Sequence, residues 1–375
     1  MKKRILQLSN YYPPEIGGIE KIAQAISDSV KDKFDVCVLC FTHDKASRTD
    51  IVDGVQVIRV GTQLKVASQQ LSTLMNTEVK KQISEYDPDI VILHAPNPFL
   101  EWILLKNIKE KCKLVVYWHS DIVKQKIGNK LLSGLTDRLL KRARVIVATS
   151  PNYIEGSRFL RKYCRKCVVI PNCIDADQLQ MSEKAKQIAE QVKKENADKH
   201  ILVCVGRQVP YKGFEYAIKA VKMLDDSFKL FLLGRSGEST PKLKQIAAND
   251  PKIIFLGEVD NDTLHAYMTA CDIFCFPSIT KNEAFGIALA EGMYYGKPAV
   301  TFTIPGSGVN YVSINGETGI EVENGCVESY TQALRSLSDD KELCEKYGQA
   351  ASMRVMSLFL QKHFEKRIIK LLEKV

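Results

Sequence analysis

Two basic side chains follow a buried apolar run in the second half of the chain, where they could bind an anion. Arg207 and Lys212 lie within VGRQVPYKG, after the run ILVCVG at 201–206 and before a helical pattern. A guanidinium can hold a diphosphate through two N–H bonds, and an ammonium adds a compact positive charge. Exposed Arg and Lys are also common without any ligand, so this pair indicates a diphosphate site only together with further residues.

Two glutamates with seven residues between them lie in SITKNEAFGIALAEGMYYGKP, residues 278–298. If the segment from Glu283 to Glu291 is helical throughout, the two acids are about 12 Å apart along the axis at 1.5 Å per residue. This exceeds the roughly 5 to 9.5 Å between two carboxylates that flank one glycosidic bond. Because acids on an apolar helix need partners, we expect each glutamate to hold a different part of one long ligand.

Parallel strands are expected to position these residues. The chain alternates short β-branched runs with amphipathic helical stretches, which is typical of an α/β fold with parallel sheets covered by helices. In the first half, strands are expected at 4–9, 36–41, 55–60, 89–95, 113–119, 144–150 and 167–171. In the second half, they are expected at 201–206, 229–234, 253–257, 273–277 and 298–302.

Each half opens with a buried strand, a glycine-containing turn and a helix, and the first of these turns holds Gly17 and Gly18. A helix that begins where a parallel strand ends offers N–H groups and the positive end of its dipole to a phosphate. Neither turn reads GxGxxG, and the second strand of each half runs into Thr42 or Arg235 instead of a ribose-binding acid, which argues against a dinucleotide. We expect two Rossmann-like domains facing a cleft that holds an elongated phosphorylated ligand.

The length of 375 residues favours two domains, at about 150 residues each. We expect an N-terminal domain over 1–180 and a second over 181–357, with the boundary in the polar segment 182–200 and an amphipathic helix at 358–375. The longest uncharged stretch, 298–316, is broken by Pro and Gly and is not expected to span a membrane. The first apolar run is too short for a signal peptide, so we expect a cytoplasmic protein.

The 11 cysteines are scattered and odd in number, which does not suit a disulfide framework. Two CxxC pairs, Cys37/Cys40 and Cys164/Cys167, lack a partner pair at zinc spacing. Two D-x-D strings, at 87–89 and 175–177, lie away from the glycine-containing turns. We therefore expect no metal site, and we interpret the cysteines as small buried side chains.

The formal net charge of +9 is concentrated between residues 124 and 166, where twelve Lys and Arg face two acids, Asp137 and Glu155. The simplest interpretation is a solvated helical face. The segment has neither interleaved aromatics nor a known nucleic-acid motif, so no nucleic-acid partner is expected. A surface that rests on the anionic inner face of a membrane stays open, since each basic residue near such lipid adds about 1 kcal/mol.

Several motifs, in the same order along residues 1 to about 325, resemble the retaining family 4 glycosyltransferases of GT-B fold. They are GGIE at 17–20, IPNCID at 170–175, the GR…KG turn at 206–213 and the Glu-seven-Glu segment with AFG. Other segments resemble bacterial mannosyltransferases and related enzymes that build O-antigen, capsule or exopolysaccharide. These are WHSDIVKQK at 118–126, VIVATSPNYIEGS at 145–157 and GSGVNYVSINGETG at 306–319. Many family members have Gly-Gly before Glu-x-Val where this chain has GSGVNYV, which matches the mannosyltransferase-like branch.

The resemblance implies four catalytic positions. His119 is expected to touch the transferred sugar near its reacting carbon, Arg207 and Lys212 to hold the diphosphate, and Glu283 to bind sugar hydroxyls. His94 also ends an expected strand and is a second-rank candidate.

Further substrate-binding positions follow from the same resemblance. Gly17 and Gly18 are expected to lie against the donor phosphates and the acceptor. Phe285 and Gly286 are expected to present backbone amides to the sugar or phosphate, and Glu291 to hold the ribose hydroxyls.

The reaction implied by the resemblance is the retaining, metal-independent transfer of a hexose from a nucleotide-sugar to a lipid-linked or oligosaccharide acceptor. GDP-mannose is the first expectation for the donor, and a UDP-sugar is the alternative. Two functions of a different class keep the same fold. A sugar-nucleotide 2-epimerase needs no acceptor, and a non-catalytic nucleotide-sugar binder never consumes its ligand.

Overall fold

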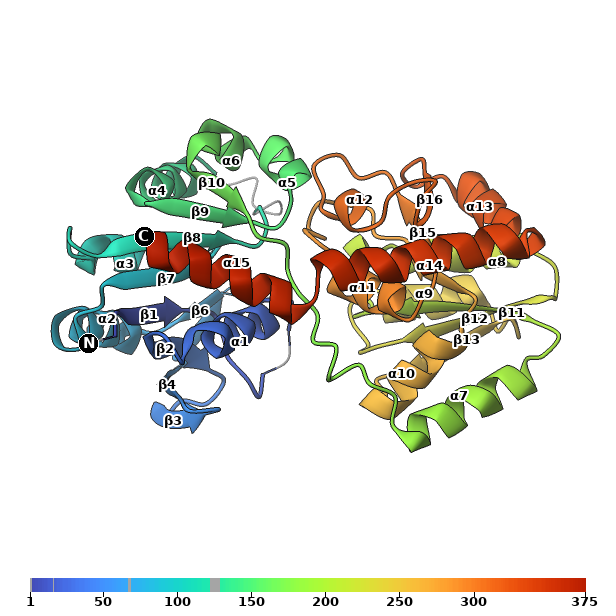
Figure 1. The fold of residues 1–375 in the computed structure, drawn as a ribbon, viewed down its shortest axis with the longest axis horizontal. Coiled ribbons are helices and arrows are strands. Elements are labelled where there is room, and N and C mark those ends of the chain that lie inside the picture. Colours follow the sequence, from blue (N-terminus) through green and yellow to red (C-terminus); the bar gives the residue numbers. More distant parts are fainter. Residues whose placement is uncertain (1, 16, 67–68, 122–128) are drawn as a thin grey trace. The chain divides into compact units, whose positions relative to one another are not determined.

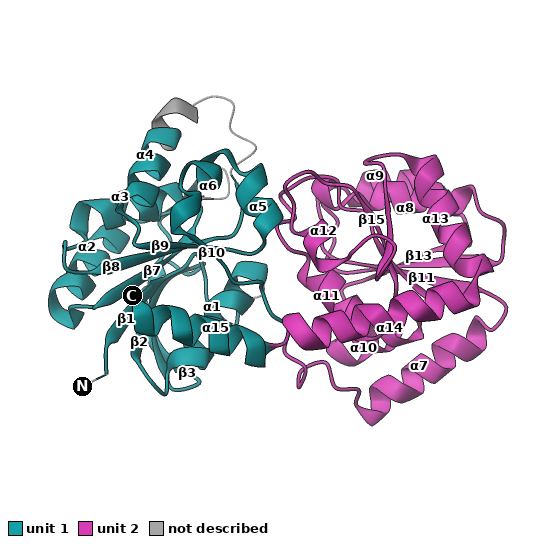
Figure 2. Ribbon diagram, turned by 45° about the horizontal axis from the view of Figure 1, so that its top comes forward, with its two compact units in different colours: residues 1–173, 361–375 teal, residues 174–360 magenta. Residues whose placement is uncertain are grey.

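The computed structural model describes residues 2–15, 17–66, 69–121 and 129–375. The chain divides into two compact units (Figure 2). Unit 1 comprises Met1–Cys173 with Gln361–Val375, and unit 2 comprises Ile174–Leu360. The part of the WHSDIVKQK motif from residue 122 onward, with Lys124 and Lys126, lies outside the described residues.

The described part of unit 1 contains an eight-stranded sheet in the order β10-β9-β8-β7-β1-β2-β4-β3. Its pairings are parallel, except that β3 runs antiparallel to β4. Its strands are β1 (Arg4–Leu8), β2 (Asp35–Thr42), β3 (Arg48–Val52), β4 (Val55–Gly61), β7 (Ile90–Ala95), β8 (Lys113–Trp118), β9 (Val145–Ala148) and β10 (Cys167–Val169). Strands β5 (Leu64–Val66) and β6 (Gln69–Leu71) pair antiparallel in a separate two-stranded sheet.

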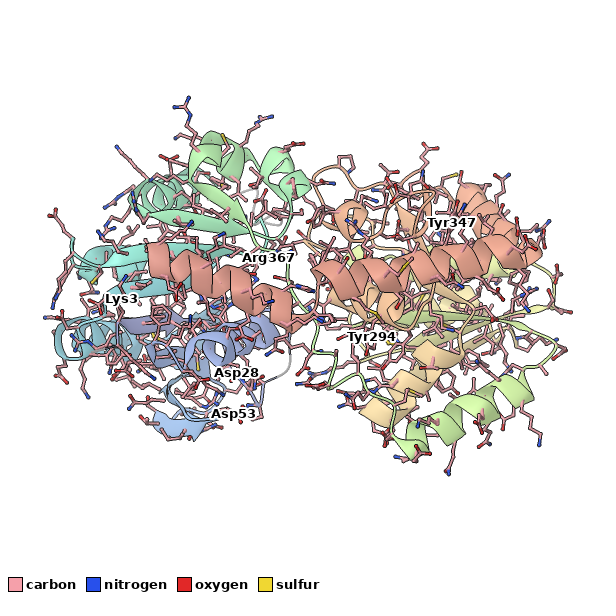
Figure 3. The ribbon with its side chains drawn as sticks, in the orientation of Figure 1. Lys3, Asp28, Asp53, Tyr294, Tyr347 and Arg367 are labelled. Carbon is pink, nitrogen blue, oxygen red and sulfur yellow. The ribbon has the colours of Figure 1, made fainter. Side chains whose placement is uncertain are left out.

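Helices flank this sheet (Figure 1). They are α1 (Gly18–Val30), α2 (Thr73–Lys81) with a π-helical turn at Gln82–Tyr86, α3 (Pro98–Asn107), α4 (Asn129–Arg142), α5 (Pro151–Gly156), α6 (Arg158–Lys162) with a 3₁₀ turn at Cys164–Lys166, and α15 (Gln361–Lys374). Helix α15 accounts for the amphipathic tail and packs against α1. Figure 3 marks these two helices by Asp28 on α1 and Arg367 on α15. The buried side chains of α15, Phe364, Ile368 and Leu372, recur every four residues and form one apolar face.

Unit 2 contains a six-stranded parallel sheet in the order β13-β12-β11-β14-β15-β16. Its strands are β11 (His200–Val205), β12 (Phe228–Leu233), β13 (Ile253–Gly257), β14 (Ile273–Phe276), β15 (Ala299–Phe302) and β16 (Gly319–Val322). Its helices are α7 (Glu183–Glu195), α8 (Phe214–Lys222) after a 3₁₀ turn at Pro210–Lys212, α9 (Thr240–Ala247), α10 (Asn261–Ala270), α11 (Ile287–Tyr294), α12 (Val309–Val312), α13 (Val327–Asp339) and α14 (Lys341–Leu358). The strand order reverses between β11 and β14, and open α/β sheets bind ligands at such a point.

All twelve strands expected from apolar runs are present, with ends that differ by no more than two residues. Four strands were not anticipated: β3, β5, β6 and β16. Strand β3 is mostly exposed, and β16 is only partly buried, so neither has the apolar pattern that marks a core strand. The polar segment 182–200 holds α7, which belongs to unit 2 and packs against α10 through a narrow apolar stripe that includes Ala185, Ala189 and Val192.

The cysteines in the described residues are free thiols, and most are buried. Within those residues no group of three or more His, Cys, Asp or Glu side chains is placed to hold a metal ion. Asp87, from the first D-x-D string, forms ion pairs with Lys109 and Lys111. Among the helices that the structure describes, none has the length and apolar character needed to cross a bilayer.

Candidate active site

The loops after β11 and β14 meet at the strand-order reversal of unit 2. Gly213 has a φ of +64° and precedes α8, and a Cβ atom there would collide with the carbonyl oxygen of Pro277, after β14. The Ile279 N–H donates a 3.0 Å hydrogen bond to the Tyr211 carbonyl oxygen, which ties the two loops together. Glycine at position 213 therefore allows both the left-handed backbone and the close approach of the loops.

This approach brings Lys212 and Glu283, which are 71 positions apart in the sequence, into a direct ion pair. The two side chains are only 13% and 12% exposed. Burial is the largest single influence and lowers the pKa of Lys212, but the Glu283 carboxylate and Tyr211 together outweigh it, so the pKa is raised. Lys212 is therefore a permanent cation in a largely desolvated position, where its charge acts more strongly than in water.

Arg207, two residues after the end of β11, is exposed. Its positive charge opposes protonation of Lys212, so the two cations lie within electrostatic range of each other. Two cations and one carboxylate leave an excess of positive charge among these three groups. The predicted pair Arg207 and Lys212 is thus brought together in a setting that suits an anion.

The loop that carries Glu283 is held by the glycine-rich segment after β15. The Ser307 hydroxyl donates to the backbone carbonyl oxygen of Glu283, and the Gly308 N–H donates to that of Ala284 at 3.1 Å. A Cβ atom at position 308 would collide with the Ala284 carbonyl oxygen. Ser307 is a positioning residue that our sequence reasoning missed, although the GSGVNYV motif pointed to its segment.

The expectation that Glu283 and Glu291 lie on one helix is wrong. Helix α11 begins at Ile287, because Gly286 adopts a left-handed conformation with φ +92° and separates the helix from the turn that carries Glu283. Glu291 lies on the second turn of α11 and is partly buried. The Phe285 side chain packs edge-on against Phe359 at 5.3 Å between ring centroids. At position 285 only the backbone amide is therefore left for a ligand.

The N-terminus of α11 lies beside this turn. The first intrahelical bond in this helix is donated by the Ala290 N–H to the Gly286 carbonyl oxygen at 3.0 Å. The amides of residues 287–289 come before that bond and have no acceptor within the helix. Gly292 lets α11 lie close to the sheet, since a Cβ atom there would come within 2.7 Å of the Phe274 ring. The helix end, Glu283 and Lys212 thus occupy one edge of unit 2.

The carboxyl edge of the sheet in unit 1 holds His119, directly after β8. His119 is 7% exposed, and its Nε2 lies 2.7 Å from Nδ1 of His94, in β7. Burial lowers the pKa of both imidazoles, to about 3 for His94. Both rings are therefore neutral, and His94 is a direct partner of His119.

Gly17 and Gly18 begin α1, after β1. The φ of Gly17 is −174°, which is ordinary extended backbone, so conformation does not require glycine there. A side chain at position 17 would instead collide with the Glu20 carboxylate, whose pKa is raised, mainly by burial. Gly18 is exposed. Gly17 makes room for Glu20 at the start of the helix.

A second polar cluster at this edge was not anticipated. The Tyr11 hydroxyl lies 3.2 Å from His43 Nδ1, and His43 Nε2 lies 3.4 Å from the Glu15 carboxylate. Across the strand-order reversal between β1 and β7, the Asn97 side-chain amide donates to the Asn10 side-chain oxygen. Sequence spacing does not reveal this cluster, because its members come from three different loops.

Two family models match the chain in succession. The model described as Glycosyltransferase Family 4 matches residues 16–178, and the model described as Glycosyl transferases group 1 matches residues 185–354. The two matches together span most of both units.

Two relatives are similar in sequence to nearly the whole chain. The D-rhamnosyltransferase WbpZ of Pseudomonas aeruginosa is 32% identical over 95% of this chain and 92% of its own. The O-antigen chain mannosyltransferase C of Escherichia coli is 28% identical over 96% of this chain and 95% of its own. Among solved structures, the sucrose-phosphate synthase from Thermosynechococcus elongatus has a TM-score of 0.80 at 17% identity, with 100% of this chain and 99% of that chain covered. The chain therefore belongs to the family 4 glycosyltransferases and is a glycosyltransferase of GT-B fold.

Proposed function

We propose that this enzyme transfers a hexose of the manno configuration from a nucleotide-sugar to a hydroxyl of a growing cell-surface polysaccharide or of a lipid-linked acceptor. The two relatives that match almost end to end are named for mannose and D-rhamnose. D-rhamnose is 6-deoxy-D-mannose, so these sugars share their ring stereochemistry and differ only at C6. Mannose from GDP-mannose is the first donor to test.

The observation that carries the proposal is the ion pair between Lys212 and Glu283 at the strand-order reversal of unit 2. In this proposal Arg207 and Lys212 hold the diphosphate of the donor, and the amides at the start of α11 add partial positive charge. Lys212 and the Ser278 hydroxyl both contact Oε2 of Glu283. The other carboxylate oxygen, Oε1, can then accept a hydrogen bond from a sugar hydroxyl. Glu291, further along α11, would bind the ribose.

The chemistry follows from this arrangement. As the bond between C1 of the sugar and the phosphate oxygen lengthens, negative charge grows on the departing nucleoside diphosphate. In this proposal Arg207 and Lys212 stabilise that charge, and such stabilisation by fixed groups is usually the largest contribution to catalysis. The acceptor hydroxyl attacks C1 on the face from which the diphosphate leaves and passes its proton to a phosphate oxygen. The configuration at C1 is retained without a nucleophile from the protein.

A panel of nucleotides tests the donor. A ligand that binds the folded protein raises its Tm, so we expect GDP and GDP-mannose to give larger shifts than UDP, ADP and their sugars. A larger shift with UDP-hexoses would move the proposal to the alternative donor.

A transfer assay tests the reaction. Release of GDP from GDP-mannose should require an acceptor such as a lipid-linked or soluble oligosaccharide. A protein that binds the donor and never releases nucleotide, with any acceptor, would be a binder. Conversion of the sugar without an acceptor would indicate an epimerase.

We also propose that unit 1 rests on anionic lipid through its basic helices. The exposed side chains Arg138, Lys141, Arg144, Arg161 and Arg165 come from α4 and from the segments that follow it. Lys162 is paired with Asp137, and Lys166 donates to backbone carbonyls, so these two contribute less. A lipid-linked acceptor would be reached from such a surface.

A further inference from the structure

At the carboxyl edge of the sheet in unit 1, three stacked rings come from β7, from β8 and from the residue after β8. His94 in β7 is the register partner of Tyr117 in β8, and His119 follows two residues later. Alternate residues of a strand face the same side, so all three side chains lie on one face of the sheet. The ring centroids of His94 and His119 are 5.0 Å apart, and those of Tyr117 and His119 are 4.8 Å apart.

The two histidines are joined by one hydrogen bond, which holds a single proton between their rings. Nδ1 of His94 and Nε2 of His119 are 2.7 Å apart, which is a hydrogen-bond distance. Both rings are neutral because burial lowers their pKa, so each carries one proton on one of its two nitrogens. One of the two rings donates and the other accepts, which leaves two possible arrangements.

The remaining nitrogen of His94 distinguishes these arrangements. Nε2 of His94 is buried and has no hydrogen-bond partner among the residues that the structure describes. If His119 were the donor, the single proton of His94 would lie on this Nε2 as a buried N–H without an acceptor, a kind of group that folded proteins rarely leave. If His94 donates through Nδ1, its Nε2 is a bare nitrogen, and His94 has no unpaired N–H.

We propose that His94 is a positioning residue that holds His119 in the tautomer with its proton on Nδ1. His119 then presents an N–H donor, and not an acceptor, to an oxygen of the substrate. The hydrogen bond made by one ring nitrogen sets the protonation of the other, so the partner on β7 determines what the catalytic candidate can bind. The assignment of substrate to His119 rests on the proposed function, whereas the tautomer does not.

Nuclear magnetic resonance measures the tautomer directly. In the full-length enzyme labelled with ¹⁵N histidine, long-range ¹H–¹⁵N correlations distinguish a protonated ring nitrogen from a bare one, and His119→Asn identifies the signals of His119. We expect a protonated Nδ1 and a bare Nε2 in His119. A protonated Nε2 in His119 would overturn the inference, even if the enzyme transfers mannose as proposed.

Two substitutions of His94 provide a kinetic test. His94→Phe keeps a ring but removes the donor, and we expect kcat/KM to fall about 10- to 100-fold, the usual effect of losing a partner that orients a reactive group. The side-chain amide of His94→Asn can replace the Nδ1 donor, so this variant should be at least tenfold more active than His94→Phe. Equal activity of the two variants would contradict the role of the hydrogen bond.

Tyr117→Phe is the matched control. It keeps the stacked ring and removes only the hydroxyl, which donates to the Asn172 side-chain oxygen at 3.0 Å. We expect its kcat/KM to stay within about threefold of the wild type. A loss as large as that in His94→Phe would show that activity falls with any hydrogen bond lost from this cluster, and would contradict a specific role of the His94 donor. If the wild type transfers no sugar at all, the proposed function fails, while the tautomer is still decided by the spectra.

Discussion

The two units share the order of six parallel strands but present different chemistry at the carboxyl edges of their sheets. In unit 2 that edge carries charged groups: Arg207, and the buried pair Lys212 and Glu283. In unit 1 the buried part of that edge carries neutral rings, those of His94 and His119, while the carboxylates of Glu15 and Glu20 lie on the loop before α1 and at its start. The shared topology therefore supplies the place, and the loops supply paired cations in one unit and uncharged buried rings in the other.

The difference follows from what each edge is proposed to hold. A diphosphate needs fixed positive charge, which unit 2 supplies on short glycine turns. Sugar hydroxyls need oriented neutral groups, which unit 1 supplies on strands that lock the rings in place.

Lys212→Ala tests the charged edge. We expect kcat/KM to fall about 100- to 1,000-fold, since a fixed group that stabilises developing charge is lost. Circular dichroism should show a folded protein. The control is Lys219→Ala on α8, an exposed lysine outside the site, which should stay within about twofold of the wild type. Near-normal kinetics in Lys212→Ala would remove the proposed difference between the two edges.

Glu101→Gln tests whether unit 1 keeps its interior uncharged. Glu101, on α3, is fully buried, and burial raises its pKa to about 7 although the Thr136 hydroxyl and the Asn97 N–H donate to it. The folded protein therefore holds this proton up to a higher pH than the unfolded chain. Stability from this group is present below about pH 4.5 and is lost as the pH rises toward 7.

Urea unfolding at pH 5 and pH 8 measures this effect. The loss between the two pH values should be on the order of 3 kcal/mol for the wild type and much smaller for Glu101→Gln, which cannot ionise. An equal pH dependence in the two proteins would mean that Glu101 is already charged in the folded state.

Gly213→Ala tests the close approach of loops that forms the charged edge. The added Cβ meets a positive φ and the Pro277 carbonyl oxygen. Gly316 has a similar φ of +74° with nothing within 4 Å of an added Cβ, so Gly316→Ala measures the backbone cost alone. We expect Gly213→Ala to be less stable than Gly316→Ala by about 2 kcal/mol in urea unfolding. Equal losses would show that the two loops do not need this contact.

Charge reversal at exposed basic residues on α6 and in the turn that follows it should have the smallest effect. Arg161→Glu with Arg165→Glu should weaken adsorption to vesicles containing anionic lipid about tenfold in a sedimentation assay at low salt. Lys193→Glu with Lys194→Glu makes the same charge change on α7 of unit 2 and should leave adsorption nearly unchanged. Equal weakening would assign the effect to net charge and not to a surface of unit 1.

The sequence alone determined the α/β class, the twelve core strands and the motifs of the family. It could do so because burial between two layers of helices leaves continuous apolar runs in parallel strands. It also singled out Arg207, Lys212 and Glu283 as candidates, since glycine turns at strand ends are visible as local patterns.

Only the tertiary structure decided which of these residues meet. The pairing of Lys212 with Glu283 depends on the loop approach at Gly213, and the start of α11 after Glu283 depends on the backbone of Gly286. The partnership of His94 with His119 depends on the register of β7 against β8. Contacts between distant segments are set by packing and strand register, and the local spacing of residues does not record them.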